Sequence, residues 1–308
     1  MLPAFMAVGL FALSSVAARR SIHFLGSNDA SLVRILVATL LLGVYAHGLG
    51  GGFGGPALGW FLASGLVGFG ICDTALFLAL PRLGAQLASL MVQCLSVPIG
   101  LVVEWLWLGT ALRPAQLCAI AVILAGVTVA LRPRRPSEVG APGRMSSGPG
   151  MGPLVLGVVA AAGQGVGAVL SRHGTLVSAA AGHPVDGLTV AYQRIWAGVA
   201  FIGAWWWIQR LRWRATGKGG GLGDSGPRWR RASPWVLVNA LSGPTLGVAS
   251  YQWALSIQPT GVVMAVAALT PLAVIPMAWI LEGQRPTASS VVGGGVGVAG
   301  VVWLALGA

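Results

Sequence analysis

The chain alternates long apolar runs with short polar connections, and ten of the runs are long enough to cross a membrane. A helix that crosses about 30 Å of hydrocarbon needs about 20 apolar residues. The runs are continuous and lack the alternation of polar and apolar residues found in barrel strands, so they predict helices. The predicted spans cover residues 2–18, 31–49, 57–80, 84–106, 114–132, 152–172, 187–208, 234–256, 259–282 and 287–306.

Composition excludes a water-soluble protein. Hydrophobic residues make up 56% of the 308 residues and charged residues only 8%, whereas soluble domains carry about a quarter charged residues. Cys72, Cys94 and Cys118 lie inside apolar runs without the close spacing of a metal or redox site, so we expect no metal and no other cofactor. The predicted fold class is an all-α, polytopic membrane helix bundle.

The net charge of +12 indicates membrane topology rather than a nucleic-acid partner. Most Lys and Arg fall in residues 132–144 and 210–231, which both separate apolar runs. Basic residues follow the first, third, fifth, seventh and ninth spans, whereas the other loops hold only Arg113 and Arg172. Because basic loops stay in the cytoplasm, we expect a multi-pass protein of the cell (inner) membrane with cytoplasmic basic loops and both termini on the opposite side.

The two halves of the chain carry matching residues in the same order, which indicates an internal repeat. Arg34-Ile35 matches Arg194-Ile195. A constant spacing of 175 residues relates Trp60, Gly68 and Ala79-Leu80 to Trp235, Gly243 and Ala254-Leu255. Later in each half, Pro98 and Glu104 match Pro276 and Glu282, Arg113-Pro114 matches Arg285-Pro286, and Ala125-Gly126-Val127 matches Ala299-Gly300-Val301.

The repeat divides the chain into residues 1–132 and 152–308, joined by a basic linker rich in Pro and Gly at 133–151. Each unit has five predicted spans, and an odd number of spans places the second unit upside down relative to the first. Inverted repeats recur in secondary transporters, where a solute site near the middle of the bilayer lies between the halves. The pattern therefore favours transport by alternating access.

These residues resemble the EamA-like transporters of the drug/metabolite transporter (DMT) superfamily over nearly the whole chain. The resemblance is carried by residues 108–116 (Leu-Gly-Thr-Ala-Leu-Arg-Pro-Ala-Gln), Thr270-Pro271-Leu272, residues 281–286 (Leu-Glu-Gly-Gln-Arg-Pro), and the two Ala-Gly-Val motifs. It implies two five-helix units and an exporter or importer of amino acids, metabolites or drugs. It does not identify the solute or the direction of transport.

Polar side chains inside the spans are the candidates for solute binding. Arg194 lies eight residues into its span, where a charge is costly unless it has a function or a partner. We expect it to face the cavity and bind an anionic group of the solute. The candidate partners in this role are Gln164, Asn239, Tyr251 and Gln252. The alternative is a hydrogen-bond network that only locks the helices together.

Other span residues are candidates for coupling and gating. Arg34 and Asp73 lie in one unit and are candidates for an ion pair, although Arg34 alternatively extends to lipid headgroups. Glu104, beside two tryptophans, is either a proton carrier or an interfacial residue. Helix kinks at a gate are predicted at Pro98, Pro271 and Pro276 because proline removes a backbone hydrogen bond.

A secondary transporter is the favoured function, and a non-transporting membrane subunit or receptor is the alternative. An embedded lipid enzyme is disfavoured because the spans hold no adjacent carboxylates, and the four histidines lie in loops or at span ends. We therefore expect no enzyme activity and no catalytic residue. The expected partners are a small-molecule solute and the lipid bilayer, without nucleic acid, and a homo-oligomer remains open.

Overall fold

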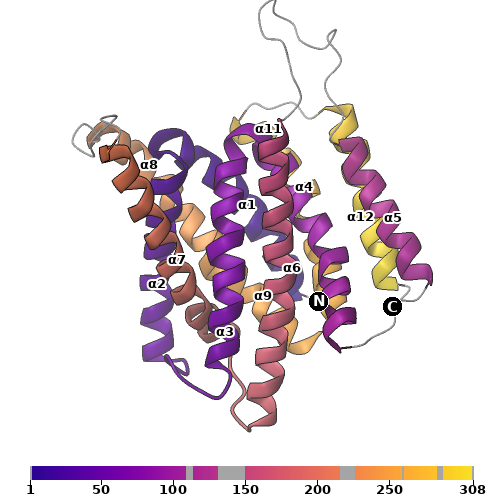
Figure 1. Cartoon of the computed structure of the whole chain (residues 1–308), viewed down its shortest axis with the longest axis horizontal. Coiled ribbons are helices and arrows are strands. Elements are labelled where there is room, and N and C mark those ends of the chain that lie inside the picture. The colour runs from indigo at the N-terminus through magenta and orange to yellow at the C-terminus, as the bar shows by residue number, and fades with distance from the viewer. Residues whose placement is uncertain are drawn as a thin grey trace, which may run out of the picture.

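The chain folds as a bundle of helices, which confirms the predicted all-α membrane fold (Figure 1). The computed structural model describes residues 2–108, 114–130, 150–215, 226–258, 260–282 and 287–306, and these ranges contain no strand. The helices are α1 (Leu2–Leu25), α2 (Ser27–Gly48), α3 (Leu58–Gly65), α4 (Asp73–Leu108), α5 (Pro114–Ala130), α6 (Met151–Ala180), α7 (Gly187–Ala215), α8 (Gly226–Ala240), α9 (Leu246–Ile257), α10 (Thr260–Ala267), α11 (Thr270–Glu282) and α12 (Ala288–Leu306).

Four breaks relate these helices to the ten predicted spans, and one of them is the turn at residues 268–269 between α10 and α11. A first π-segment (Leu66–Cys72) joins α3 to α4, and a second π-segment (Leu241–Thr245) joins α8 to α9. Within α4, Gly84 has φ 77°, a conformation that side chains disfavour, and it separates two spans. Among the described residues, five helices are long and apolar enough to cross a membrane, including Leu58–Ala85, which ends directly after this glycine, and Leu87–Trp107, which follows it.

Several helices extend further than the apolar runs that predicted them. The helix α1 continues to Leu25 rather than residue 18, and α2 begins at Ser27 rather than residue 31, with Gly26 at φ 81° between them. The helices α6 and α7 likewise end eight and seven residues later than predicted, at Ala180 and Ala215. The apolar run marks only the part of a helix that suits hydrocarbon, so the prediction missed the polar turns that continue beyond it.

Glycines allow the helices to approach closely. A Cβ atom on Gly165 of α6 would lie 2.7 Å from the backbone oxygen of Ser96 on α4. The last helices of the two halves, α5 and α12, lie side by side at one edge of the bundle (Figure 1). There, a Cβ atom on Gly126 would lie 2.4 Å from the backbone nitrogen of Gly297. The span glycines therefore serve helix packing, as is common in membrane proteins.

The halves pack against each other along much of their length. The helix α2 packs against α7, and α1 packs against α8, α9 and α11. Ile35 on α2 and Ile195 on α7 are both fully buried in one apolar cluster. These two isoleucines directly follow Arg34 and Arg194, the matched arginines of the repeat. The two arginines therefore extend from helices that pack against each other.

Candidate functional site

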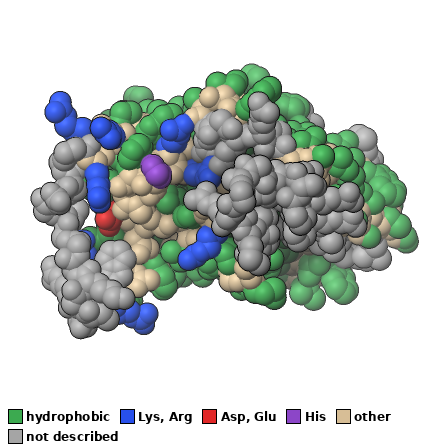
Figure 2. Space-filling model, turned by 90° about the horizontal axis from the view of Figure 1, so that it is seen from above, with side chains coloured by type: hydrophobic (Ala, Val, Ile, Leu, Met, Phe, Trp, Pro, Cys, Tyr) green, Lys and Arg blue, Asp and Glu red, His purple; other side chains and the backbone are tan. Residues whose placement is uncertain are grey.

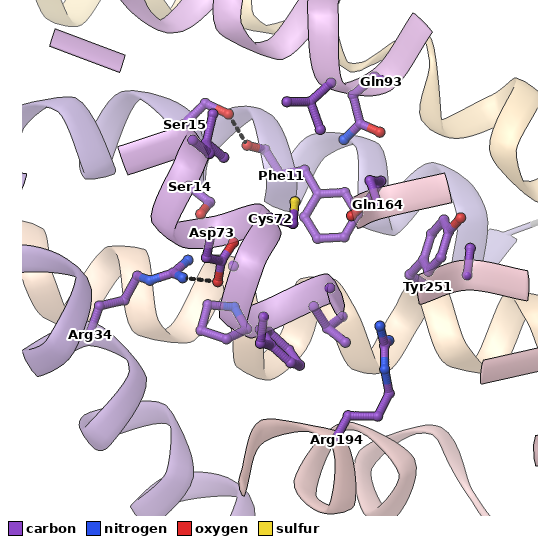
Figure 3. Close-up of a pocket in the computed structure, with 18 residues that line it drawn as sticks. Phe11, Ser14, Ser15, Arg34, Cys72, Asp73, Gln93, Gln164, Arg194 and Tyr251 are labelled. Atoms are coloured by element: carbon purple, nitrogen blue, oxygen red, sulfur yellow. Dashed lines mark hydrogen bonds and ion pairs between the residues drawn. The ribbon is translucent and has the colours of Figure 1, made fainter. Parts of the chain in front are cut away.

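A cavity of about 110 Å³ lies between the two halves, where the two π-segments meet α1, α2, α4, α6, α7 and α9 (Figure 3). Its wall combines polar, charged and apolar side chains from both repeats. The lining residues are Phe11, Ser14, Ser15, Arg34, Gly68, Phe69, Cys72, Asp73, Leu76, Val92, Gln93, Gln164, Ala168, Arg194, Gly243, Pro244, Val248 and Tyr251. The cavity is therefore shared by the repeats, as a solute site between halves requires.

The two π-segments begin at equivalent positions of the repeat. Leu66 and Leu241 are separated by the 175 residues that relate the two halves in this region. In the second segment, Pro244 has no backbone N–H to donate, which favours a widened turn. In the first segment, Gly68 and Gly70 give the backbone the necessary freedom. Single π turns are frequent at functional sites because they displace the residues that follow.

Arg34 and Asp73 form an ion pair in the cavity wall (Figure 3). Arg34 is only 5% exposed, and its guanidinium also lies 4.6 Å from the centre of the Phe77 ring. Because α2 begins four residues earlier than predicted, Arg34 lies deep in the bundle rather than near its end. The predicted pairing is thus present, and Arg34 does not extend to lipid headgroups.

Arg194 reaches the same cavity from α7 without a carboxylate partner among the described residues (Figure 3). It is 7% exposed, and its guanidinium lies 5.4 Å from the centre of the Phe69 ring. Its Nε is buried without a hydrogen-bond partner. A buried, unpaired guanidinium offers planar donors and a full positive charge to an anionic group.

Tyr251 and Gln164 also line the cavity, as predicted for solute contacts. Tyr251 is buried, and its ring centre lies 6.0 Å from that of Phe11. Gln93, a buried side chain of α4, lies in the same wall and was not among the predicted residues. Its amide inside an apolar run was a signal of the kind that identified Gln164. The hydroxyls of Ser14 and Ser15 were also missed, because serines are ordinary in membrane helices.

Asn239 and Gln252 are buried but do not line the cavity. Ser14 donates a hydrogen bond of 2.8 Å to Oδ1 of Asn239, which ties α1 to α8. Ser171 donates a hydrogen bond of 2.6 Å to Oε1 of Gln252, which ties α6 to α9. Both amides therefore bridge helices, which is the locking role that the sequence left open for the polar residues.

The remaining candidates lie away from the cavity wall. Glu104 is half-buried on α4 beyond the cavity. Pro98 and Pro276 lie within α4 and α11. Pro271, however, is the second residue of α11, where a backbone N–H has no partner within the helix in any case. The predicted span 259–282 is interrupted by a turn at residues 268–269, directly before α11, and a role of these prolines in a gate stays a prediction.

The charges of the wall leave one positive charge uncompensated. Among the lining residues only Arg34, Asp73 and Arg194 carry formal charge, and the first two neutralise each other. A helical membrane bundle whose two repeats share a cavity is an architecture that recurs in membrane transporters.

Comparison with known proteins identifies the family. A model of the EamA-like transporter family matches residues 1–132 and 152–306. The chain belongs to the EamA-like transporter family and so to the DMT superfamily of small-solute transporters. One solved structure, titled only "Crystal structure of protein", covers 99% of this chain and 96% of its own with a TM-score of 0.59 at 20% identity, which shows a shared fold. No curated protein matches the chain.

Proposed function

We propose that this protein moves a small anionic solute across the cell membrane by alternating access, with Arg194 as the main solute contact. The observation that carries the proposal is the buried guanidinium of Arg194, which lies in the wall between the repeats with no acidic partner among the described residues. Tyr251 and Gln164 supply hydrogen-bonding groups beside it. A charge left in this position costs several kcal/mol unless a ligand compensates it.

The arrangement of basic residues supports an orientation for the transporter. Arg228 and Arg231 at the start of α8 lie around a surface hollow with His23 at the end of α1. Figure 2 shows Lys and Arg side chains gathered around a histidine on the face seen from above. Arg20 also lies over Trp235 of α8, with 5.5 Å from its guanidinium carbon to the ring centre. This basic face is the one we propose for the cytoplasm, by the positive-inside rule.

A non-transporting subunit or receptor is the alternative function. A non-transporting subunit has no need of a buried cationic cavity shared by two repeats. The apolar and hydrogen-bonding contacts between α2 and α7 or α1 and α8 would suffice to hold a scaffold together. The cavity charge therefore favours a transporter that releases and rebinds a solute.

The proposal is tested by flux into vesicles that contain the purified protein. The panel is a mixture of labelled amino acids, short carboxylates, amines and sugars, measured in both directions. Arg194→Ala should reduce flux of the transported solute by about tenfold or more, because a hydrogen bond to a charged group contributes about 1.5 to 3 kcal/mol. Arg20→Ala, which removes an arginine outside the cavity, should retain wild-type flux.

Protein yield and a single gel-filtration peak show that each variant inserts and folds. Wild-type flux in Arg194→Ala at equal protein density would refute its role as a solute contact. Absence of flux by the wild type across the whole panel would overturn the transporter proposal in favour of a subunit or receptor.

A further inference from the structure

The two cavity arginines occupy equivalent places in the repeat. Each directly precedes an isoleucine of the shared buried cluster and is the eighth residue of its helix, α2 or α7. Each also reaches across to the π-segment of the opposite repeat. A Cβ atom on Gly243 would lie 3.4 Å from Nη1 of Arg34, and one on Gly68 would lie 2.9 Å from Nη2 of Arg194. The spacing of 175 residues makes these two glycines equivalent as well.

The two repeats differ at the residue that compensates the charge of the arginine. Asp73 begins α4 directly after the first π-segment and pairs with Arg34. The equivalent residue 175 positions later is Val248, and it also lines the cavity. Val248 packs against the apolar cluster that contains Tyr192 and Ile195, the neighbours of Arg194. Where the first repeat holds a carboxylate for its arginine, the second holds an isopropyl group.

We propose that Val248 is the residue that sets the charge selectivity of the cavity, and that the solute is a small monoanion whose carboxylate takes the place that Asp73 takes in the first repeat. This inference rests on the proposed transport function and adds the residue that determines specificity. Val248 has this effect because it carries no negative charge. An acidic side chain at position 248 would neutralise Arg194 from within the protein.

The charge and size of the cavity define the solute class. The lining residues carry a net charge of +1, so a bound monoanion makes the occluded site neutral, whereas a cation or a dianion leaves a net charge in a medium of low dielectric. The volume of about 110 Å³ is smaller than the ~150 Å³ cavity that holds benzene. A short-chain carboxylate with about six heavy atoms suits both limits in this conformation.

Val248→Asp and Val248→Asn form a matched pair for the test, because the two new side chains have the same shape and differ in charge. Both variants and the wild type are reconstituted in vesicles, and counterflow is measured with labelled pyruvate and lactate, neutral lactamide and cationic ethanolamine. The wild type should carry pyruvate or lactate and exclude the other two probes. The flux of Val248→Asp should be about tenfold or more below that of Val248→Asn, since close buried charge pairs contribute about 1.5 kcal/mol or more.

Three flux results would overturn the inference while the transport function stands. These are wild-type transport of lactamide or ethanolamine as readily as pyruvate, equal loss in Val248→Asn and Val248→Asp, and undiminished carboxylate flux in Val248→Asp. Wild-type flux of a solute from the broad panel without flux of pyruvate or lactate would likewise overturn the solute class, whereas absence of flux across the broad panel would refute the proposed function.

Thermal unfolding tests the pairing without any transport. Val248→Asp is measured in the wild-type protein and in Arg194→Ala, with Val248→Asn in both as the control. We expect Val248→Asp to lower the melting temperature much more when Arg194 is absent, because its carboxylate is then buried without a partner. Equal shifts in the two backgrounds would show that position 248 does not neutralise Arg194, which would overturn the inference whether or not flux is seen.

Discussion

Replacement of Asp73 by Asn should strongly destabilise the folded protein. The substitution keeps the shape of the side chain and one oxygen that accepts a hydrogen bond from Arg34, but it removes the negative charge. Arg34 is 5% exposed, and its Nε already lacks a hydrogen-bond partner. Removal of one partner from a buried ion pair costs about 3 to 5 kcal/mol. We expect the lower end, about 3 kcal/mol, because the hydrogen bond and the Phe77 ring contact remain.

The matched control removes both charges. In Arg34→Met combined with Asp73→Leu, no charge is left without a partner, and such replacements are often neutral or stabilising. The double variant should therefore be more stable than Asp73→Asn, although it carries more changes. The free energy of unfolding is measured for the wild type, Asp73→Asn and the double variant by reversible unfolding in mixed micelles with increasing SDS.

Two results would contradict this reasoning. If Asp73→Asn unfolds at the same free energy as the wild type, Arg34 is solvated by water or lipid headgroups rather than compensated by Asp73. If the double variant loses as much stability as Asp73→Asn, the loss reflects shape and packing instead of an uncompensated charge.

Two further predictions concern close helix approaches, and each has a control glycine, in the same helix for Gly65 and in the partner helix α12 for Gly126. Gly65→Ala should cost about 1 to 3 kcal/mol, because its Cβ would lie 1.8 Å from a backbone oxygen of α7, whereas Gly59→Ala, with open space around it, should be neutral or slightly stabilising. Similarly, Gly126 has its Cβ position 2.4 Å from the nitrogen of Gly297, so Gly126→Ala should destabilise the α5 and α12 pair while Gly295→Ala does not. Thermal unfolding in detergent measures both pairs, and equal melting temperatures within either pair would contradict the packing described here.

The sequence alone predicts the fold and the charged part of the site. Long apolar runs have few stable structures in a bilayer, so they determine the helices and their order. Charges inside such runs are so costly that each requires a partner or a function, which pointed to Arg34, Asp73 and Arg194. The structure places all three in one cavity wall, and the pairing of the first two is as predicted.

The direction in which neutral polar side chains point could not be predicted in the same way. A membrane helix is apolar on every side, so hydropathy gives no direction to an isolated amide. Asn239 and Gln252 consequently looked equivalent to Gln164, although they bond to serines of neighbouring helices while Gln164 faces the cavity. The π-segments were also missed, because a widened turn has no distinct hydrophobic period and depends on residues such as Pro244 in their helical context.

Comparison of the repeats distinguishes residues that stabilise the scaffold from residues that determine which solute binds. Where the halves agree, as at Gly68 and Gly243, the shared residue permits a close contact that each half needs. Where the halves differ at the cavity wall, as at Asp73 and Val248, the difference adds nothing to a symmetric scaffold but changes the charge that a solute meets. The same spacing relates Leu76 to Tyr251, so at this matched position the second repeat has a hydroxyl where the first has an apolar side chain. Under the proposed function, both departures favour solute recognition around Arg194 in the second repeat, because Asp73 already neutralises Arg34 in the first repeat.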